Sequence, residues 1–109
     1  MATKIYNKLV RDLIPDIIKD SGNECRTRIL SDKEYLKMLD AKLDEELAEY
    51  HRDQNVEELA DLLELIQAAT IARGYTLEEL EAVRAEKAKK RGGFDKKIFL
   101  IDVNEKTID

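Results

Sequence analysis

The sequence predicts an all-α protein: a helical bundle of about four helices, with an optional minor two-stranded ribbon. Pro15 is the only proline and there are only four glycines, so long stretches lack helix breakers. Leucines recur at three- and four-residue spacing through much of residues 36–69, as one face of a helix requires. Residues that commonly cap helices, Ser31, Asn55 and Thr76, stand directly before the helical stretches.

Composition limits the classes of function. A chain of 109 residues, 43% of them hydrophobic, is predicted to fold as a single domain over residues 1–109. The net charge of -5 disfavours binding to a nucleic-acid polymer. The N-terminus resembles neither a signal peptide nor a membrane span, and the lone Cys25 cannot form an internal disulfide. We therefore expect a cytoplasmic protein that does not associate with membranes.

Two less regular elements are expected near the ends of the chain. Apolar residues at helical spacing over residues 8–20 predict a short helix, interrupted by Pro15 and ended by Gly22. The stretch ECRTRIL, residues 24–30, is a candidate strand, and KKIFLIDV, residues 96–103, is its natural partner. A two-stranded ribbon persists only when it packs on helices.

The second helix is predicted to begin at Ser31, which forms a capping-box pattern with Glu34. Its apolar face comprises Leu36, Leu39, Leu43, Leu47 and Tyr50.

Two further helices are expected. Asn55 is positioned to cap a third helix that runs to Gly74, and Thr76 with Glu79 repeats the capping-box pattern for a fourth that ends at Gly92. The third helix is apolar around most of its circumference, which one neighbour cannot cover. We therefore expect the chain to form a homodimer or homotetramer.

Four acidic residues are predicted to converge inside the bundle. Glu46 and Glu49 lie three residues apart on the apolar side of the second helix, and Glu58 and Asp61 do so on the third. Glu45 points more nearly outward. The short polar link HRDQN, residues 51–55, favours antiparallel packing of the two helices, which would bring the four carboxylates together.

Such a cluster favours a divalent cation. Carboxylates at low dielectric repel one another and lose hydration unless protons or cations compensate. Oxygen ligands suit Mg²⁺, with Mn²⁺ as the alternative. The ordinary interpretation is that acidic residues lie on solvated helix faces, and Glu58 also stands where a capping-box glutamate follows Asn55. The doubled pattern on two apolar sides favours the metal site.

These residues resemble a known family. Glu46-x-x-Glu49 followed by Glu58-x-x-Asp61 is similar to the paired acidic signature of the MazG-like all-alpha nucleoside triphosphate pyrophosphohydrolases. The opening NKLVRDLIPDIIKDSG and the closing KKRGGFDKKIFL resemble the ends of a MazG-like subgroup of house-cleaning pyrophosphatases. The resemblance implies a Mg²⁺-dependent enzyme that cleaves a nucleoside triphosphate, or a related phosphoanhydride, to monophosphate and pyrophosphate, and that assembles into dimers or tetramers.

The resemblance also implies roles for individual residues. The metal ligands would be Glu46, Glu49, Glu58 and Asp61, and Glu45 would orient or deprotonate the attacking water. The catalytic residues would be Glu45, Glu46 and Glu49. Binding of the negatively charged phosphates also requires positive charge. Candidates are Lys87, Lys90 and Arg91 before a Gly-Gly pair, and Lys8 and Arg11 in the opening motif.

Each cationic candidate has an ordinary alternative. Basic residues at a helix C-terminus complement the helix dipole, and Lys8 and Arg11 could simply be solvated. His51 in the polar link is expected at the surface.

Two other functions stay open. Phosphoribosyl-ATP pyrophosphohydrolase, an enzyme of histidine synthesis, shares the acidic pattern. A non-catalytic helical module could use an acidic face to bind a partner. The NKLVRD and RGGF motifs favour the MazG-like subgroup, and the base and sugar of its substrate cannot be deduced from the sequence.

Overall fold

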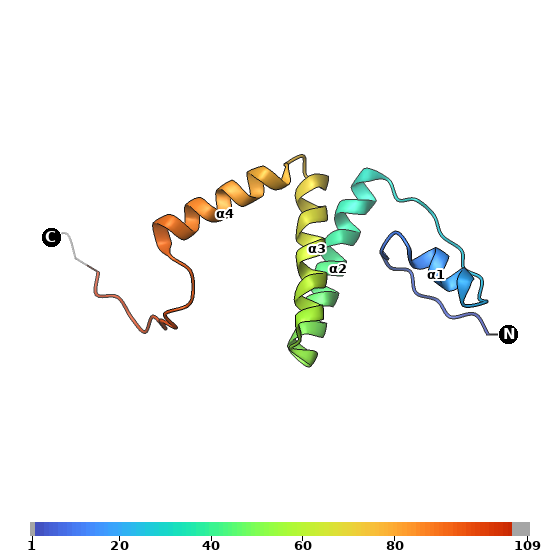
Figure 1. Ribbon diagram of the computed structural model, residues 1–109, viewed down its shortest axis with the longest axis horizontal. Helices are drawn as coiled ribbons and strands as arrows, with labels where there is room; N and C mark the ends of the chain where they lie inside the picture. The colour runs from blue at the N-terminus through green and yellow to red at the C-terminus, as the bar shows by residue number, and fades with distance from the viewer. Residues whose placement is uncertain (1, 106–109) are drawn as a thin grey trace. The chain divides into compact units, whose positions relative to one another are not determined.

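The computed structural model describes residues 2–105, within which four helices form (Figure 1). They are α1 (Ile14–Asp20), α2 (Asp32–Asp53), α3 (Val56–Ala72) and α4 (Leu77–Arg91). This architecture confirms the all-α class. The chain divides after Leu77 into two compact units, the first holding α1 to α3 and the second most of α4, and each is described by itself.

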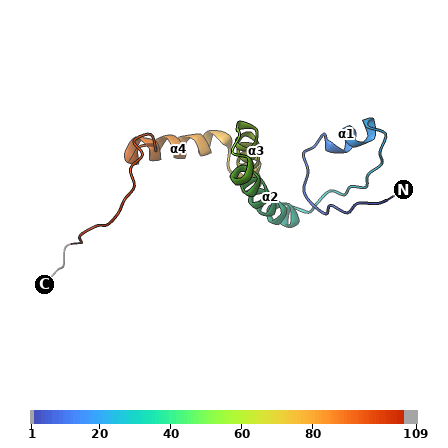
Figure 2. The same cartoon turned by 90° about the horizontal axis from the view of Figure 1, so that it is seen from below.

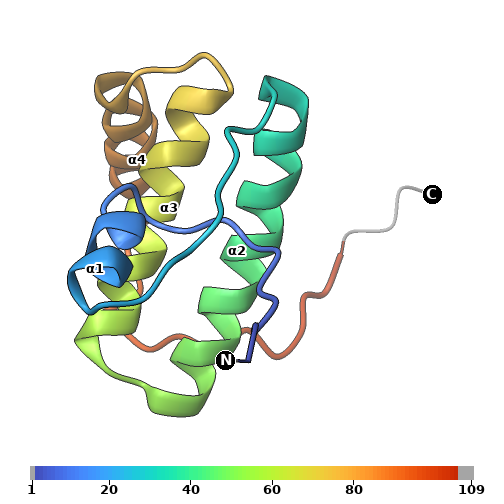
Figure 3. The same cartoon turned by 90° about the vertical axis from the view of Figure 1, so that its right-hand side faces the viewer.

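An antiparallel pair of helices, α2 and α3, forms the centre of the first unit (Figure 1, Figure 3). Figure 2 shows the same pair from one end. Ser31 Oγ accepts the Glu34 N–H at 3.2 Å, and Glu34 Oε1 accepts the Ser31 N–H at 3.2 Å, which completes the expected capping box. Asn55 Oδ1 accepts the Glu58 N–H at 3.0 Å and caps α3. Both predicted helix starts are confirmed.

The connection between α2 and α3 is shorter than the sequence suggested. Residues 51–53 continue α2, so His51 lies exposed in its last turn rather than in a loop. Gln54 then adopts a left-handed conformation, with φ of 50°, and Asn55 begins the capped start of α3. This tight reversal places the last turns of α2 beside the first turns of α3, the segments that carry the acidic residues.

The first helix is also shorter than predicted, because it begins at Ile14 rather than near residue 8. Proline has no N–H to donate and a fixed φ, so Pro15 fits the first turn of a helix but would disrupt its interior. Residues 2–13 consequently form an irregular segment, which we call the N-terminal arm. Asn7 in this arm has a φ of 45°.

The optional two-stranded ribbon does not form in the part of the chain described. Residues 24–30 and 96–103 carry no strand. Apolar side chains such as Ile29 and Phe99 are exposed there, so these segments lack the packed helical support that a ribbon requires.

The first unit buries little of its apolar surface. Leu39 on α2 is the buried apolar residue of the described chain, and Glu46 is the buried charged residue. The third helix ends where expected, because Gly74, with φ of 90°, adopts the left-handed conformation that glycine allows. Across residues 2–105, no helix combines the length and apolar character needed to cross a membrane.

Candidate metal centre

The acidic residues of α2 and α3 converge as the sequence predicted. Carboxylate oxygens of Glu46, Glu58 and Asp61 lie within 4.8 Å of one another, and so do those of Glu45, Glu46 and Glu49. Glu46 belongs to both groups and joins them. We call these five residues the acidic cluster.

Glu46 is the most constrained member of the acidic cluster. Its residue surface is only 7% exposed, and its Oε2 atom is buried without a hydrogen-bond partner. Burial raises the pKa of Glu46 to about 7, and the nearby carboxylate of Glu49 adds to that rise. Lys42 opposes the rise. A cation beside Oε2 would relieve both the lost hydration and the repulsion.

Glu58 shows the same problem on the facing helix. Its Oε2 is also buried without a hydrogen-bond partner. Desolvation raises the pKa of Glu58, and the negative charges of Glu49 and Asp61 raise it further. Each of the two helices therefore directs one unsatisfied carboxylate oxygen into the same acidic cluster.

A lysine that the sequence analysis did not identify belongs to this site. Lys42 Nζ lies 3.2 Å from Glu45 Oε1 and 3.4 Å from Glu46 Oε1. Its position three and four residues before these glutamates is the spacing of helical ion pairs, so the signal was present in the sequence. Lys42 neutralises part of the acidic cluster but leaves Glu46 Oε2 without a partner.

Glu45 is held by two lysines. Lys8 Nζ, from the N-terminal arm, donates to Glu45 Oε1 at 3.2 Å, as Lys42 Nζ does. Partial burial raises the pKa of Glu45, but the hydrogen bonds from Lys42 and Lys8 outweigh that effect and bring the pKa below its usual value. Because its pKa is lowered, Glu45 stays ionised but is a weak base, which suits it to orient a water rather than to accept its proton.

Arg11 connects the arm to the third helix. Its Nη2 donates to Asp61 Oδ1 at 2.6 Å, a short charge-assisted hydrogen bond between residues far apart in the sequence. The structure therefore brings Lys8 and Arg11, two of the predicted substrate-binding residues, into direct contact with the acidic cluster.

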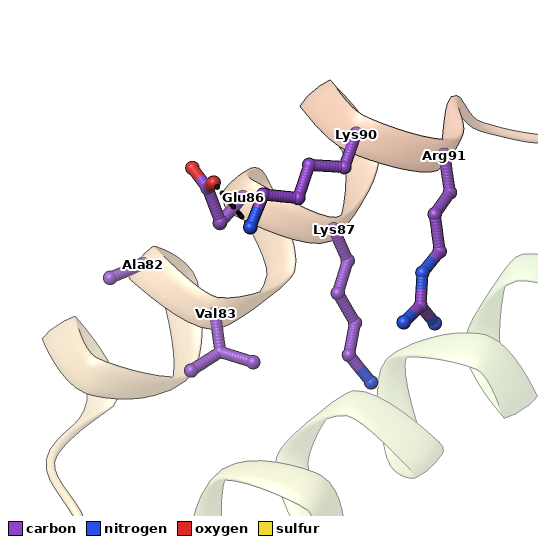
Figure 4. A pocket seen from close by; sticks show the side chains of 6 residues that line it. All are labelled: Ala82, Val83, Glu86, Lys87, Lys90 and Arg91. Carbon is purple, nitrogen blue, oxygen red and sulfur yellow. Dashed lines mark ion pairs between the residues drawn. The ribbon is translucent and has the colours of Figure 1, made fainter.

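The other predicted phosphate-binding residues belong to the second unit. Lys87, Lys90 and Arg91 line a shallow hollow of about 330 Å³ along one face of α4 (Figure 4). Lys90 Nζ is paired with Glu86 Oε1 at 3.3 Å, a helical i,i+4 ion pair. The three residues share one face of their own helix, and their role in binding phosphate stays a prediction.

The donor set of the acidic cluster fits a hard divalent cation. All its side chains offer carboxylate oxygens, which Mg²⁺ and Mn²⁺ prefer. When all are ionised, five carboxylates face the three cations Lys8, Arg11 and Lys42, which leaves an excess of two negative charges. One divalent cation would balance that excess. The acidic cluster could therefore hold a divalent cation.

Comparisons with known proteins assign no family. No protein-family model matches the chain, and no solved structure matches it. A segment of 42 residues is 60% identical to part of an uncharacterized protein of Mycolicibacterium smegmatis (strain ATCC 700084 / mc(2)155). The match spans 38% of this chain and 43% of that protein, less than half of each. Function must therefore be argued from the residues of the site.

Proposed function

We propose that this protein is a Mg²⁺-dependent nucleoside triphosphate pyrophosphohydrolase of the MazG-like type. The observation that carries the proposal is the pair of buried, unpartnered oxygens, Glu46 Oε2 and Glu58 Oε2, on two residues of one acidic cluster. Buried carboxylate oxygens without partners destabilise a fold, so a pair of helices with a purely structural role has no reason to carry two of them. The resemblance of the opening and closing motifs to the MazG-like subgroup supplies the reaction.

The acidic cluster divides into groups with different tasks. Glu46, Glu49, Glu58 and Asp61 would hold the metal, with Mn²⁺ as an alternative to Mg²⁺. The bound ion would offset phosphate charge and make a water more acidic. Glu45, kept ionised by Lys8 and Lys42, would accept a hydrogen bond from the attacking water and so orient it.

The proposed metal ligands lie on the two packed helices α2 and α3, which keep them rigid. Ligands from two capped, antiparallel helices are fixed in position, and catalysis of phosphoryl transfer depends mainly on such positioning and on charge stabilisation. The water attacks the alpha or the beta phosphorus, and the bond from that phosphorus to the oxygen that bridges the two breaks. The bridging oxygen leaves with the electron pair of the bond, and the proton of the water passes to solvent. House-cleaning of non-canonical nucleotides is the role we propose for this reaction.

The test is a panel of canonical and modified nucleoside triphosphates, incubated with the full chain and Mg²⁺. We expect monophosphate and pyrophosphate as products. Reaction in ¹⁸O-labelled water would locate the attacked phosphorus, because the label enters the fragment that carries it. Diphosphate with inorganic phosphate as products would contradict the proposal, as would the absence of hydrolysis across the panel.

The panel also separates the alternatives. Including phosphoribosyl-ATP tests the enzyme of histidine synthesis, which would cleave that compound in preference to the nucleoside triphosphates. A non-catalytic acidic module would cleave none of them, although it could still bind a cation.

A further inference from the structure

We propose that Lys8 and Arg11 of the N-terminal arm bind the polyphosphate of the substrate, and that the acidic cluster itself positions these two cations. This inference rests on the proposed function and adds to it. It assigns phosphate recognition to an irregular segment of the first unit, through residues whose partners are carboxylates of the metal centre.

The contacts of the arm leave its cations available to a second partner. Arg11 is 56% exposed, and one nitrogen of its guanidinium donates to Asp61 Oδ1. A guanidinium carries five N–H donors, so the exposed part can bind another anion while the bond to Asp61 persists. The Lys8 side chain is likewise 40% exposed beside Glu45, and its Nζ carries three donors.

The carboxylates fix these long side chains at the rim of the acidic cluster. Lysine and arginine side chains lose rotamer entropy when they are ordered, which weakens binding by free surface cations. Here Glu45 and Asp61 order Lys8 and Arg11 before any ligand arrives. A phosphate would therefore meet donors that are already placed.

The charge of the site makes the arm necessary. With one divalent cation bound, the five carboxylates, Lys42 and the arm sum to no net charge. Without Lys8 and Arg11, the metal-loaded site would retain two negative charges and would repel a polyphosphate. With the two cations of the arm, an acidic cluster that attracts metal ions can also accept an anion.

Removing a cationic side chain from the arm should have different effects on the affinity for Mg²⁺ and on the affinity for a polyphosphate. Removing the charge of Arg11 lowers the repulsion felt by Mg²⁺, so metal affinity should stay the same or increase. The same change removes a charge-assisted hydrogen bond to phosphate, so affinity for a polyphosphate should fall roughly tenfold. A general loss of structure would instead weaken both.

The experiment measures calorimetric binding of Mg²⁺ alone, and then of inorganic tripolyphosphate at saturating Mg²⁺, to the full chain. Arg11→Ala and Lys8→Ala should each weaken tripolyphosphate binding without weakening Mg²⁺ binding. Arg11→Lys should recover most of the loss, because it keeps the charge. Arg73→Ala is the matched control: Arg73 is 53% exposed and pairs with Asp40 on α2 at 3.5 Å, away from the acidic cluster.

The results distinguish this inference from the proposed function. Tripolyphosphate binding that is unchanged in Arg11→Ala and Lys8→Ala would overturn the inference, even if the wild-type chain hydrolyses nucleotides. A parallel loss of Mg²⁺ affinity would also overturn it, because Arg11 would then only support Asp61. If tripolyphosphate binding depends on Arg11 but no nucleotide is cleaved, the inference stands and the proposed reaction fails.

Discussion

Lys42 Nζ lies 3.4 Å from Glu46 Oε1, whereas the other oxygen of the same carboxylate is buried without a hydrogen-bond partner. Lys42 thus forms an ion pair with one oxygen of the Glu46 carboxylate and leaves the other without a partner. Burial, with Glu49 close by, raises the pKa of Glu46 to about 7 despite that lysine. Near neutral pH, a metal ion would therefore have to compete with a proton for Glu46.

The first prediction concerns stability without metal. The folded pKa of Glu46, about 7, exceeds the ordinary value of 4.5, so the folded state binds a proton that the unfolded state has released between these values. The stabilisation that the folded state gains from this proton on Glu46 is complete below pH 4.5 and is lost as the pH rises through 7. Glu46→Gln, which stays neutral, should abolish this loss and increase the free energy of unfolding at pH 8 by about 1–3 kcal/mol.

Urea unfolding in the presence of a chelator, from pH 5 to pH 8, measures this effect. Glu64→Gln is the control, since Glu64 is exposed on α3 and outside the acidic cluster. A Glu46→Gln variant that is less stable than the wild type at pH 8 would show that the carboxylate is already satisfied.

The second prediction is that Mg²⁺ stabilises the fold. A ligand that binds only the folded state adds about 2.7 kcal/mol at a concentration one hundred times its Kd. Each kcal/mol raises the Tm of a domain of this size by roughly 4–8 °C. Glu58→Gln and Asp61→Asn should reduce the rise, and calorimetric scans with and without millimolar Mg²⁺ would reveal it. An equal rise in these variants would place the metal elsewhere.

The third prediction concerns turnover. Glu49→Gln keeps the size of the side chain but removes a charge from the acidic cluster, so pyrophosphate release should fall roughly a hundredfold, since even residues that merely support a metal ligand contribute 10–100-fold. Glu64→Gln should retain activity. Far-ultraviolet circular dichroism would verify that both variants fold. Equal losses of activity in the two variants would indicate that the wrong face of α3 was assigned.

The sequence predicted α2 and α3 well because their signals are local. Ser31 and Asn55 cap within three residues of themselves, and the helical spacing of Glu46, Glu49 and Glu58 determined which side they face. Convergence of the carboxylates then needed only an antiparallel reversal, which the short link indicated.

Other features depended on contacts that no local pattern reveals. The bond between Arg11 and Asp61 joins residues separated by 50 positions, so it could not be read from spacing. The predicted start of α1 near residue 8 was wrong, because residues 8–13 have helical apolar spacing but the helix begins only at Ile14, with Pro15 in its first turn. Lys42 is different, because its helical spacing of three residues from Glu45 is a local pattern that does indicate an ion pair.

The last prediction is that the chain self-associates through α3. Leu59, Leu63 and Ile66 are exposed in the single chain, and their spacing of four and three residues places them on one face of the helix. Burying each such side chain contributes about 1.5–3 kcal/mol, so leaving the face in water would be costly, and a second copy can cover it with the same residues. Light scattering at micromolar concentration should therefore give at least twice the chain mass of 12.6 kDa. Leu63→Lys should lower that mass, whereas Ile29→Lys, at an exposed position outside the helices, should not. A wild-type mass near 12.6 kDa would reject self-association.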